Sequence, residues 1–217
     1  MCHETLTLQP TRFLMPTMAV LCFLLFSFSN GDTQTRRKYI IQSDESRLEV
    51  QVRKGGLLKF LGHDHLVSVR AMTGHIELTE ESITPAALQI SIAADSLLII
   101  DEKKEKDRVK IQQDMREKVL ETAKYPQIQF ESSAVRVVSE PDTNLQYNLR
   151  IEGDLTLHGV TQPIEIAASL VFTNDSLRAQ GRFFLNQKNF RIKTASAAIG
   201  TVKVKDKLEL SFDIVAR

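Results

Sequence analysis

The chain has 217 residues, of which 42% are apolar and 25% are charged, close to the average for a globular protein. This composition excludes a disordered chain, a collagen-like repeat and a multi-pass membrane protein, and the length predicts one domain. The 28 basic and 27 acidic residues leave a net charge of +1. Because this balance gives no sign of nucleic-acid binding or of a polybasic membrane patch, we expect a partner to be recognised through shape and apolar surface.

Residues 1–31 are predicted to be a secretory signal peptide. Residues 13–28 read FLMPTMAVLCFLLFSF, with Arg12 before them and a small, polar run after them, which is the order of a basic, an apolar and a cleavable region. An uncleaved anchor is the alternative, but Pro16 interrupts the run, which is shorter than the roughly 20 residues of a spanning helix. We expect a mature domain at residues 32–217, exported to the periplasm or secreted, without stable membrane insertion.

The mature domain is predicted to contain no thiol chemistry. Its sequence has no cysteine, since Cys2 and Cys22 both lie in the predicted signal peptide. This excludes a disulfide scaffold, a thiolate zinc site and a cysteine nucleophile from the body of the protein. Lipid attachment at Cys22 is disfavoured, because Leu21 rather than a small residue precedes it.

Apolar residues recur at every second position from Leu48 onward, the period of a strand with one buried face. The longest run spans residues 147–157 and contains Gly153, which indicates a bulge or sharp bend. The alternation changes parity near residues 132–134, which predicts a second bulge. Short turn signals separate the runs, so we expect an all-β protein of eight or more antiparallel strands. Closure into a barrel or a two-sheet sandwich would protect their edges.

Residues 101–122 are predicted to form the one helix. The segment is rich in charged helix formers and lacks glycine and proline, and Asp101 could cap its start. Ile111, Met115 and Val119 recur at four-residue spacing and form a narrow apolar stripe. Two interpretations stay open: a solvated connector that rests on the barrel, or a lid over an open barrel mouth.

An eight-stranded barrel either fills with its own side chains or holds one slender ligand. Inward positions such as Ala179 and Gly181 are small and would leave room for a long apolar molecule, whereas a filled core is the alternative. The lining offers no group for acid–base chemistry, so a bound ligand would be a hydrocarbon chain held by burial, at about 0.8 kcal/mol per methylene. The candidate lining residues are Phe130, Leu149, Ile151, Leu155, Leu157, Ile166, Leu170, Phe183, Leu185, Phe190 and Phe212.

His63 and His65 flank Asp64, and a strand would place both imidazoles on one face, which can begin a metal site. Neither His75 nor His158 lies at a diagnostic spacing for a third ligand. We therefore favour surface or structural histidines over a metal site or a pH-sensitive hinge, and expect no resident cofactor. The nucleophile-elbow, zinc-protease, P-loop and dinucleotide motifs are missing from the sequence, so an enzyme is not expected.

Two segments carry a family resemblance. YPQIQFES at residues 125–132, followed by GDLTLHGVT at residues 153–161 and Pro163, resembles the YceI-like polyisoprenoid-binding family. Further matches are Gly74, the NQKNFRI run at residues 186–192, and residues 202–212. One departure is Arg191, where a glycine is expected after Phe190.

The resemblance implies an extended, lipocalin-like antiparallel eight-stranded β-barrel with one α-helix over its opening. It also implies that an apolar tunnel holds an isoprenoid chain. The favoured function is therefore non-enzymatic carriage or sequestration of an isoprenoid lipid or quinone. A periplasmic, stress-related structural protein with a filled core and a histidine-based metal enzyme are the alternatives. A homodimer is compatible with the sequence.

Overall fold

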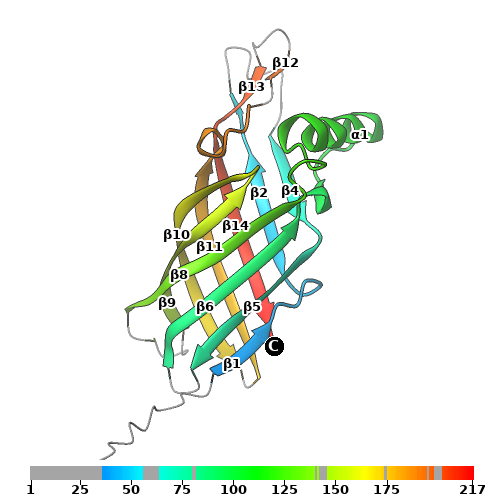
Figure 1. The fold of residues 1–217 in the computed structure, drawn as a ribbon. Coiled ribbons are helices and arrows are strands. Elements are labelled where there is room, and N and C mark those ends of the chain that lie inside the picture. The colour runs from blue at the N-terminus through cyan, green and yellow to red at the C-terminus, as the bar shows by residue number, and fades with distance from the viewer. Residues whose placement is uncertain are drawn as a thin grey trace, which may run out of the picture. The chain divides into compact units, whose positions relative to one another are not determined.

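The computed structural model describes residues 36–55, 64–79, 82–139, 141, 146–173, 175–194, 196–197 and 202–217. The predicted signal peptide at residues 1–31 lies outside the described residues. The part of the chain from Gln34 to Arg217 forms one compact unit. It is mostly β, with a strongly curled antiparallel sheet and one α-helix (Figure 1).

The main sheet has eleven strands among the described residues, in the order β1-β5-β6-β8-β9-β10-β11-β14-β2-β4-β7. Their bounds are β1 (Arg36–Ile40), β2 (Arg47–Val52), β4 (His65–Val69), β5 (Met72–Thr79), β6 (Ser82–Ala93), β7 (Leu97–Ile99), β8 (Gln127–Ser139), β9 (Gln146–Leu157), β10 (Val160–Thr173), β11 (Ser176–Asn186) and β14 (Lys207–Ala216). A smaller sheet has the order β12-β13-β3, with β3 (Lys54–Gly55), β12 (Ser196–Ala197) and β13 (Val202–Val204).

The eleven strands agree with the eight or more that the alternation predicts, but they exceed the eight that the family resemblance implies, because short strands and breaks divide the strand paths. A single turn of 3-10 helix, η2 (Ala94–Ser96), separates β6 from β7. As a result, β6 pairs with β5 and β8 near one edge of the sheet. β7 pairs with β4 and forms the other edge of the sheet. The predicted bulge between Ser132 and Ala134 on β8 is confirmed.

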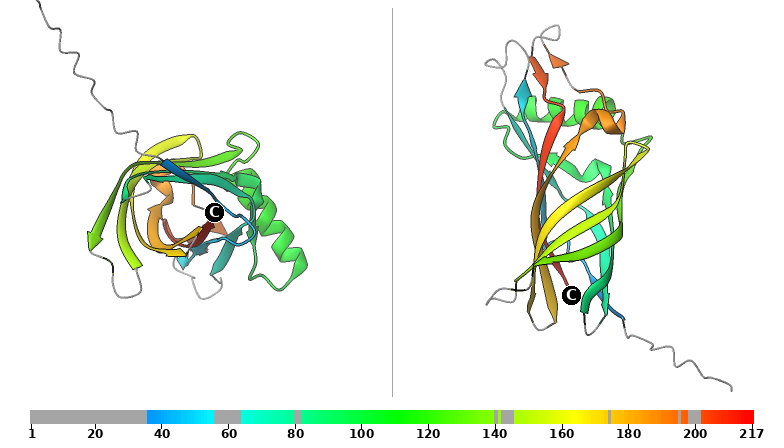
Figure 2. Two further views of the ribbon diagram at one scale, coloured as in Figure 1. Left: turned by 90° about the horizontal axis from the view of Figure 1, so that it is seen from below. Right: turned by 90° about the vertical axis from the view of Figure 1, so that its left-hand side faces the viewer.

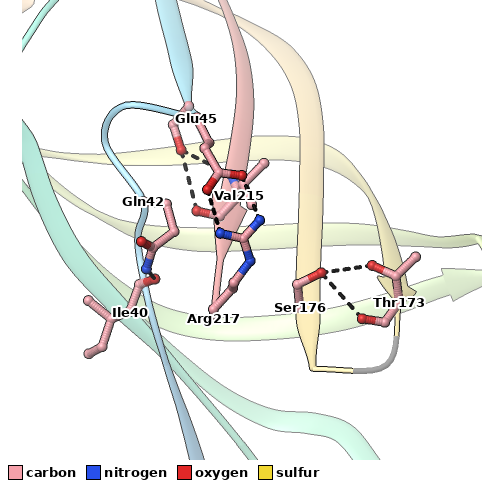
Figure 3. A network of polar contacts seen from close by, with 8 residues as sticks. Ile40, Gln42, Glu45, Thr173, Ser176, Val215 and Arg217 are labelled. Atoms are coloured by element: carbon pink, nitrogen blue, oxygen red, sulfur yellow. Dashed lines mark hydrogen bonds and ion pairs between the residues drawn. The ribbon is translucent and has the colours of Figure 1, made fainter.

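The curled sheet is tied together where β1 meets the end of β14, at the lower end in Figure 1. Ile41 bridges Ala216, and the backbone N–H of Arg217 donates to the carbonyl of Ile40 at 3.0 Å. The guanidinium of Arg217 also donates to the carboxylate of Glu45, with Nη2 at 2.6 Å from Oε2 (Figure 3). The strands therefore surround an interior, as the view from below shows (Figure 2).

The helical segment is shorter than predicted. Helix α1 spans Glu105–Asp114 and continues as a single π-helical stretch, η3 (Met115–Val119). The predicted cap at Asp101 is wrong: the N-cap residue is Lys104, with no side-chain cap hydrogen bond, and the carboxylate of Asp101 lies 3.6 Å from His65 Nδ1. No helix in the described part of the chain is both long and apolar enough to cross a membrane.

Candidate functional site

The interior of the curled sheet contains a cavity of about 550 Å³. Its wall is built from the inward-facing residues of the strands, which follow the alternation of the sequence. On β14 these are Leu208, Leu210, Phe212 and Ile214, and on β2 they are Leu48, Val50 and Val52. The alternating pattern therefore gives the cavity its apolar character, because the polar residues between them face outward.

Most of the candidate lining residues from the sequence lie on this wall. The structure brings together Phe130, Ile151, Leu155, Leu157, Ile166, Phe183, Leu185 and Phe212. The candidate lining residues do not include a further set on β4 to β7, nor Ile192 beyond η4. The apolar residues of this further set are Val67, Val69, Met72, Ile76, Leu88, Ile90, Ile92, Leu97 and Ile99.

Leu149 and Leu170 are buried but do not line the cavity. They lie toward the β1 end of the curled sheet, close to an aromatic cluster. The ring of Phe172 packs edge-on against Tyr39 and Tyr147, with ring centroids 6.5 Å and 6.1 Å apart. None of these three rings lines the cavity, whereas residues of the helical segment do, so the cavity extends toward the other end, where α1 lies (Figure 1).

Phe190 also lies away from the cavity wall. It belongs to the 3-10 turn η4 (Gln187–Phe190) and is only 1% exposed, so its ring contributes to the core. Its backbone carbonyl lies 3.3 Å from Nδ1 of His158. Phe190 therefore lies in a turn after β11 ends at Asn186, and its candidacy as a lining residue is wrong.

Helix α1 and η3 contribute the side chains of Ile111, Met115 and Val119 to the cavity wall. These are the three residues of the predicted apolar stripe. The π-helical stretch holds Met115 and Val119 toward the same cavity, in keeping with the frequent use of such stretches at functional sites. The helical segment therefore covers part of the cavity.

Gln112 fastens α1 to the edge of the main sheet. Its side-chain amide donates to the carbonyl of Leu97 at 2.6 Å and accepts from the backbone N–H of Ile99 at 2.9 Å. Both partners belong to β7, the last strand of the sheet. The Gln112 amide thus makes the two backbone hydrogen bonds that a residue of a neighbouring strand would make. It satisfies N–H and C=O groups at the β7 edge that would otherwise be left without these bonds.

His158 links the turn between β9 and β10 to the segment that follows η3. It forms the turn between β9 and β10 together with Gly159, and both have positive φ values of 53° and 70°, as a tight hairpin turn requires. Nε2 of His158 lies 2.7 Å from the carboxylate of Glu121, and its ring packs against Tyr125 at a centroid distance of 4.4 Å. These contacts link the turn between β9 and β10 to the segment after η3.

Polar groups enter the cavity wall at the end near α1, and only His65 among them is a candidate from the sequence. They are Lys54, His65, Asp114, Gln187 and Lys203. Lys54 continues the inward parity of Val50 and Val52, which is the signal that could have found it. The cavity therefore has an apolar end and a polar end.

The histidine pair predicted as a weak metal candidate is only half described. His63 lies outside the described residues, and His65 lies 3.6 Å from Asp101 through Nδ1. Within the described ranges, no three His, Cys, Asp or Glu residues are grouped as metal ligands would be. A second hollow, of about 390 Å³, lies between β2, β10, β11 and β14 and is lined mainly by polar and charged residues such as Arg47, Glu49 and Asp213.

A curled antiparallel sheet with one helix around an apolar cavity defines a class of β-rich binding domains. Residues 39–216 match the model of the YceI-like domain, and the chain belongs to this family. The Protein YceI of Escherichia coli O157:H7 is 32% identical over 124 residues, which cover 54% of this chain and 58% of that protein. A UPF0312 protein of Pseudomonas syringae pv. syringae is 33% identical over 89 residues, 41% of each chain. The chain therefore matches about half the length of these curated relatives.

Two solved structures share the fold. Burkholderia cenocepacia BcnA has a TM-score of 0.60 at 15% identity, covering 82% of this chain and 99% of that chain. A polyisoprenoid binding domain from Saccharophagus degradans, implicated in plant cell wall breakdown, has a TM-score of 0.61 at 14% identity, covering 82% and 97%. At such identities the likeness concerns the fold alone.

Proposed function

We propose that this protein binds a long apolar molecule, an isoprenoid lipid or a prenylated quinone, in the cavity and carries or sequesters it without chemical change. The observation that carries the proposal is the cavity of about 550 Å³ with an almost wholly aliphatic and aromatic wall. Its volume lies within the range of roughly 300–1,000 Å³ that ligand sites occupy. Membership of the YceI-like family and the polyisoprenoid-binding relative support the choice of ligand.

The energetics require a long chain. Burial gains about 0.8 kcal/mol per methylene, so ten methylenes contribute roughly 8 kcal/mol. Association costs on the order of 4–15 kcal/mol in lost freedom, which a short chain does not offset. The wall residues from Ile151 to Leu157 on β9 span about 20 Å at roughly 3.3 Å per residue, so the cavity has length for such a chain.

The finer architecture follows from this function. We propose that the sheet acts as a lipocalin-like barrel, closed at the end of Tyr39 and Phe172, with α1 as a lid at the opposite end. The cavity favours a carrier over the alternative of a structural protein with a filled core. The wall contains no serine, threonine or cysteine among the described residues, which favours binding over acyl transfer.

We also propose that the protein acts outside the cytoplasm. The apolar run at residues 13–28 supports export, with the carrier acting in the periplasm or after secretion. Fractionation of cells that express the full chain tests this directly. We expect a shortened protein outside the cytoplasm, and a full-length protein retained in the cytoplasm would contradict the proposal.

Native mass spectrometry tests the binding. We expect the gently purified mature protein to carry an excess mass that organic extraction identifies as an isoprenoid lipid or quinone. Ile151→Trp fills the cavity and should remove that mass, whereas Arg150→Trp, on the outer face of the same strand, should retain it. Both variants should keep the Tm of the parent. A parent that never carries or takes up an apolar molecule would overturn the proposed function.

A further inference from the structure

The net charge of the whole chain is close to zero, but its charged residues are unevenly distributed along the molecule. The described residues at the α1 end fall in the segments 52–55, 64–66, 100–126, 157–161, 186–194 and 202–208. They contain 16 lysine and arginine residues against 9 aspartate and glutamate residues. The rest of the described residues contain 10 lysine and arginine residues against 12 aspartate and glutamate residues. The end of the molecule that carries the polar part of the cavity wall is therefore strongly basic.

The segment that covers the cavity presents three of these charges to solvent. Lys106 and Lys110 lie one turn apart on α1, Lys103 lies just before the helix, and Val109 between the lysines is 55% exposed. On the same element, Glu105 pairs with Arg108, and Asp114 pairs with Lys118 at 2.5 Å. Asp107 is also exposed and lies one helical turn from Lys103 and Lys110.

The three lysines differ from these pairs. In the described part of the chain, Lys103, Lys106 and Lys110 have no hydrogen-bond or ion-pair partner. Their charge is therefore directed to solvent, around an exposed valine. Such a face is complementary to an anionic surface.

The basic face adjoins the route to the cavity. Ile111, the next residue after Lys110, lines the cavity, and so does Lys203 on β13, at the same end of the molecule (Figure 1). At the opposite end lies the aromatic cluster of Tyr39, Tyr147 and Phe172, none of which lines the cavity. An apolar ligand that leaves a bilayer would therefore meet the open end of the cavity only if the α1 end faces the bilayer.

We propose that the α1 end is a docking face for an anionic lipid bilayer, which presents the cavity to the membrane for uptake and release of its ligand. This inference rests on the proposed function for its purpose, but docking itself depends only on the basic face. Each basic residue near an anionic leaflet contributes about 1 kcal/mol, or about fivefold in binding. The attraction weakens as salt shortens the screening length, which is about 10 Å at 0.1 M.

Co-sedimentation with vesicles tests the docking face. The full mature chain should bind vesicles of phosphatidylcholine mixed with an equal weight of phosphatidylglycerol, and should not bind vesicles of phosphatidylcholine alone. The triple variant Lys103→Gln, Lys106→Gln, Lys110→Gln should bind the mixed vesicles on the order of a hundredfold more weakly. A matched control, Arg70→Gln, Arg150→Gln, Arg182→Gln, removes the same charge from exposed positions elsewhere and should bind like the parent.

Three results would overturn the inference: equal binding of the parent to both kinds of vesicle, no loss in the lysine variant, or an equal loss in the control variant. Uptake of a prenylquinone from detergent solution is measured in parallel, with no vesicles present. The lysine variant should take up the quinone as the parent does. A parent that binds the mixed vesicles and takes up no quinone would contradict the proposed function and leave the docking face supported.

Discussion

The ring of Phe130 on β8 lies across Gly153 on β9, so closely that a Cβ at residue 153 would come within 2.6 Å of Cζ of the ring. The same relationship recurs between Phe212 and Gly181, where the distance would be 2.5 Å. Both phenylalanines line the cavity. The expectation that Gly181 leaves room for a ligand is therefore wrong: Phe212 occupies that room, and the cavity lies beyond the ring.

Gly153→Ala should lower the free energy of unfolding by roughly 1–3 kcal/mol, the cost of overpacking a well-filled site. The added methyl would meet both the ring of Phe130 and the carbonyl of Glu131, which cannot move aside easily. Urea denaturation measures the loss. Gly55→Ala is the control, since its Cβ would meet the flexible side chain of Lys205 first, at 3.1 Å, and should cost far less. Equal losses in the two variants would contradict the packing argument.

Arg191→Gly should stabilise the protein by about 0.5–1 kcal/mol. Arg191 has φ 57° and ψ 20°, a left-handed conformation that costs a non-glycine residue roughly 1–2 kcal/mol. Part of the gain is offset by the greater freedom of glycine in the unfolded chain. Arg191→Ala separates backbone from side chain, because alanine keeps the Cβ and should bring no gain. Thermal denaturation that ranks alanine above glycine would refute this prediction.

Gln112→Leu should loosen α1 from the sheet. Removing the amide leaves the N–H of Ile99 and the carbonyl of Leu97 without their partner, at about 1–3 kcal/mol for a buried unsatisfied group. Hydrogen exchange should accelerate across residues 105–119. Gln113→Leu is the matched control, because Gln113 is exposed and bonds only Glu117. Exchange rates that match in the two variants would show that the amide does not anchor the helix.

Ligand binding should slow hydrogen exchange in the same segment if α1 is a lid. Ile111, Met115 and Val119 line the cavity, so an occupied cavity gives them additional contacts. Comparison of the protein before and after saturation with a prenylquinone measures the effect. Unchanged exchange over residues 105–119 would leave α1 as a solvated connector.

The Arg178–Asp213 pair should make stability depend on pH in acid. Hydrogen bonding from the guanidinium of Arg178 lowers the pKa of Asp213 below its ordinary value of 3.8. The folded-state pKa is below the unfolded one, so the pair stabilises the protein above about pH 4. That stabilisation is lost as the pH falls through the folded-state pKa. Arg178→Ala should therefore lower the Tm slightly at neutral pH, since a solvent-exposed ion pair contributes little to stability. The difference from the parent should vanish in strong acid, and a constant difference at all pH values would contradict this origin.

The alternation of apolar residues was enough to predict a sheet with one apolar face, and eight of the eleven candidate lining residues do line the cavity. It was also enough to locate the stripe on α1, because Ile111, Met115 and Val119 lie at helical spacing. Periodicity is a local property of the sequence, so it can be recognised within one segment without knowledge of the fold.

Contacts between distant segments could not be predicted in this way. The contact of His158 with Glu121 joins residues 37 positions apart, and the pairing of Gln112 with β7 requires the edge of the sheet to be known. The aromatic cluster around Phe172 depends on three strands meeting in space, so Leu149 and Leu170 could not be told from cavity residues. The basic end is likewise hidden in a net charge of +1, because charge separation arises only when the chain folds.

The chain contains no tryptophan, so a single introduced tryptophan reports on its own surroundings. Phe183 and Phe184 are neighbours on β11 with opposite orientations: Phe183 lines the cavity, and Phe184 is 55% exposed. Titration of the Phe183→Trp variant with a prenylquinone should quench its fluorescence and saturate at one equivalent. The Phe184→Trp variant should show no saturable quenching. Equal quenching of the two variants, or none in either, would contradict a ligand site inside the curled sheet.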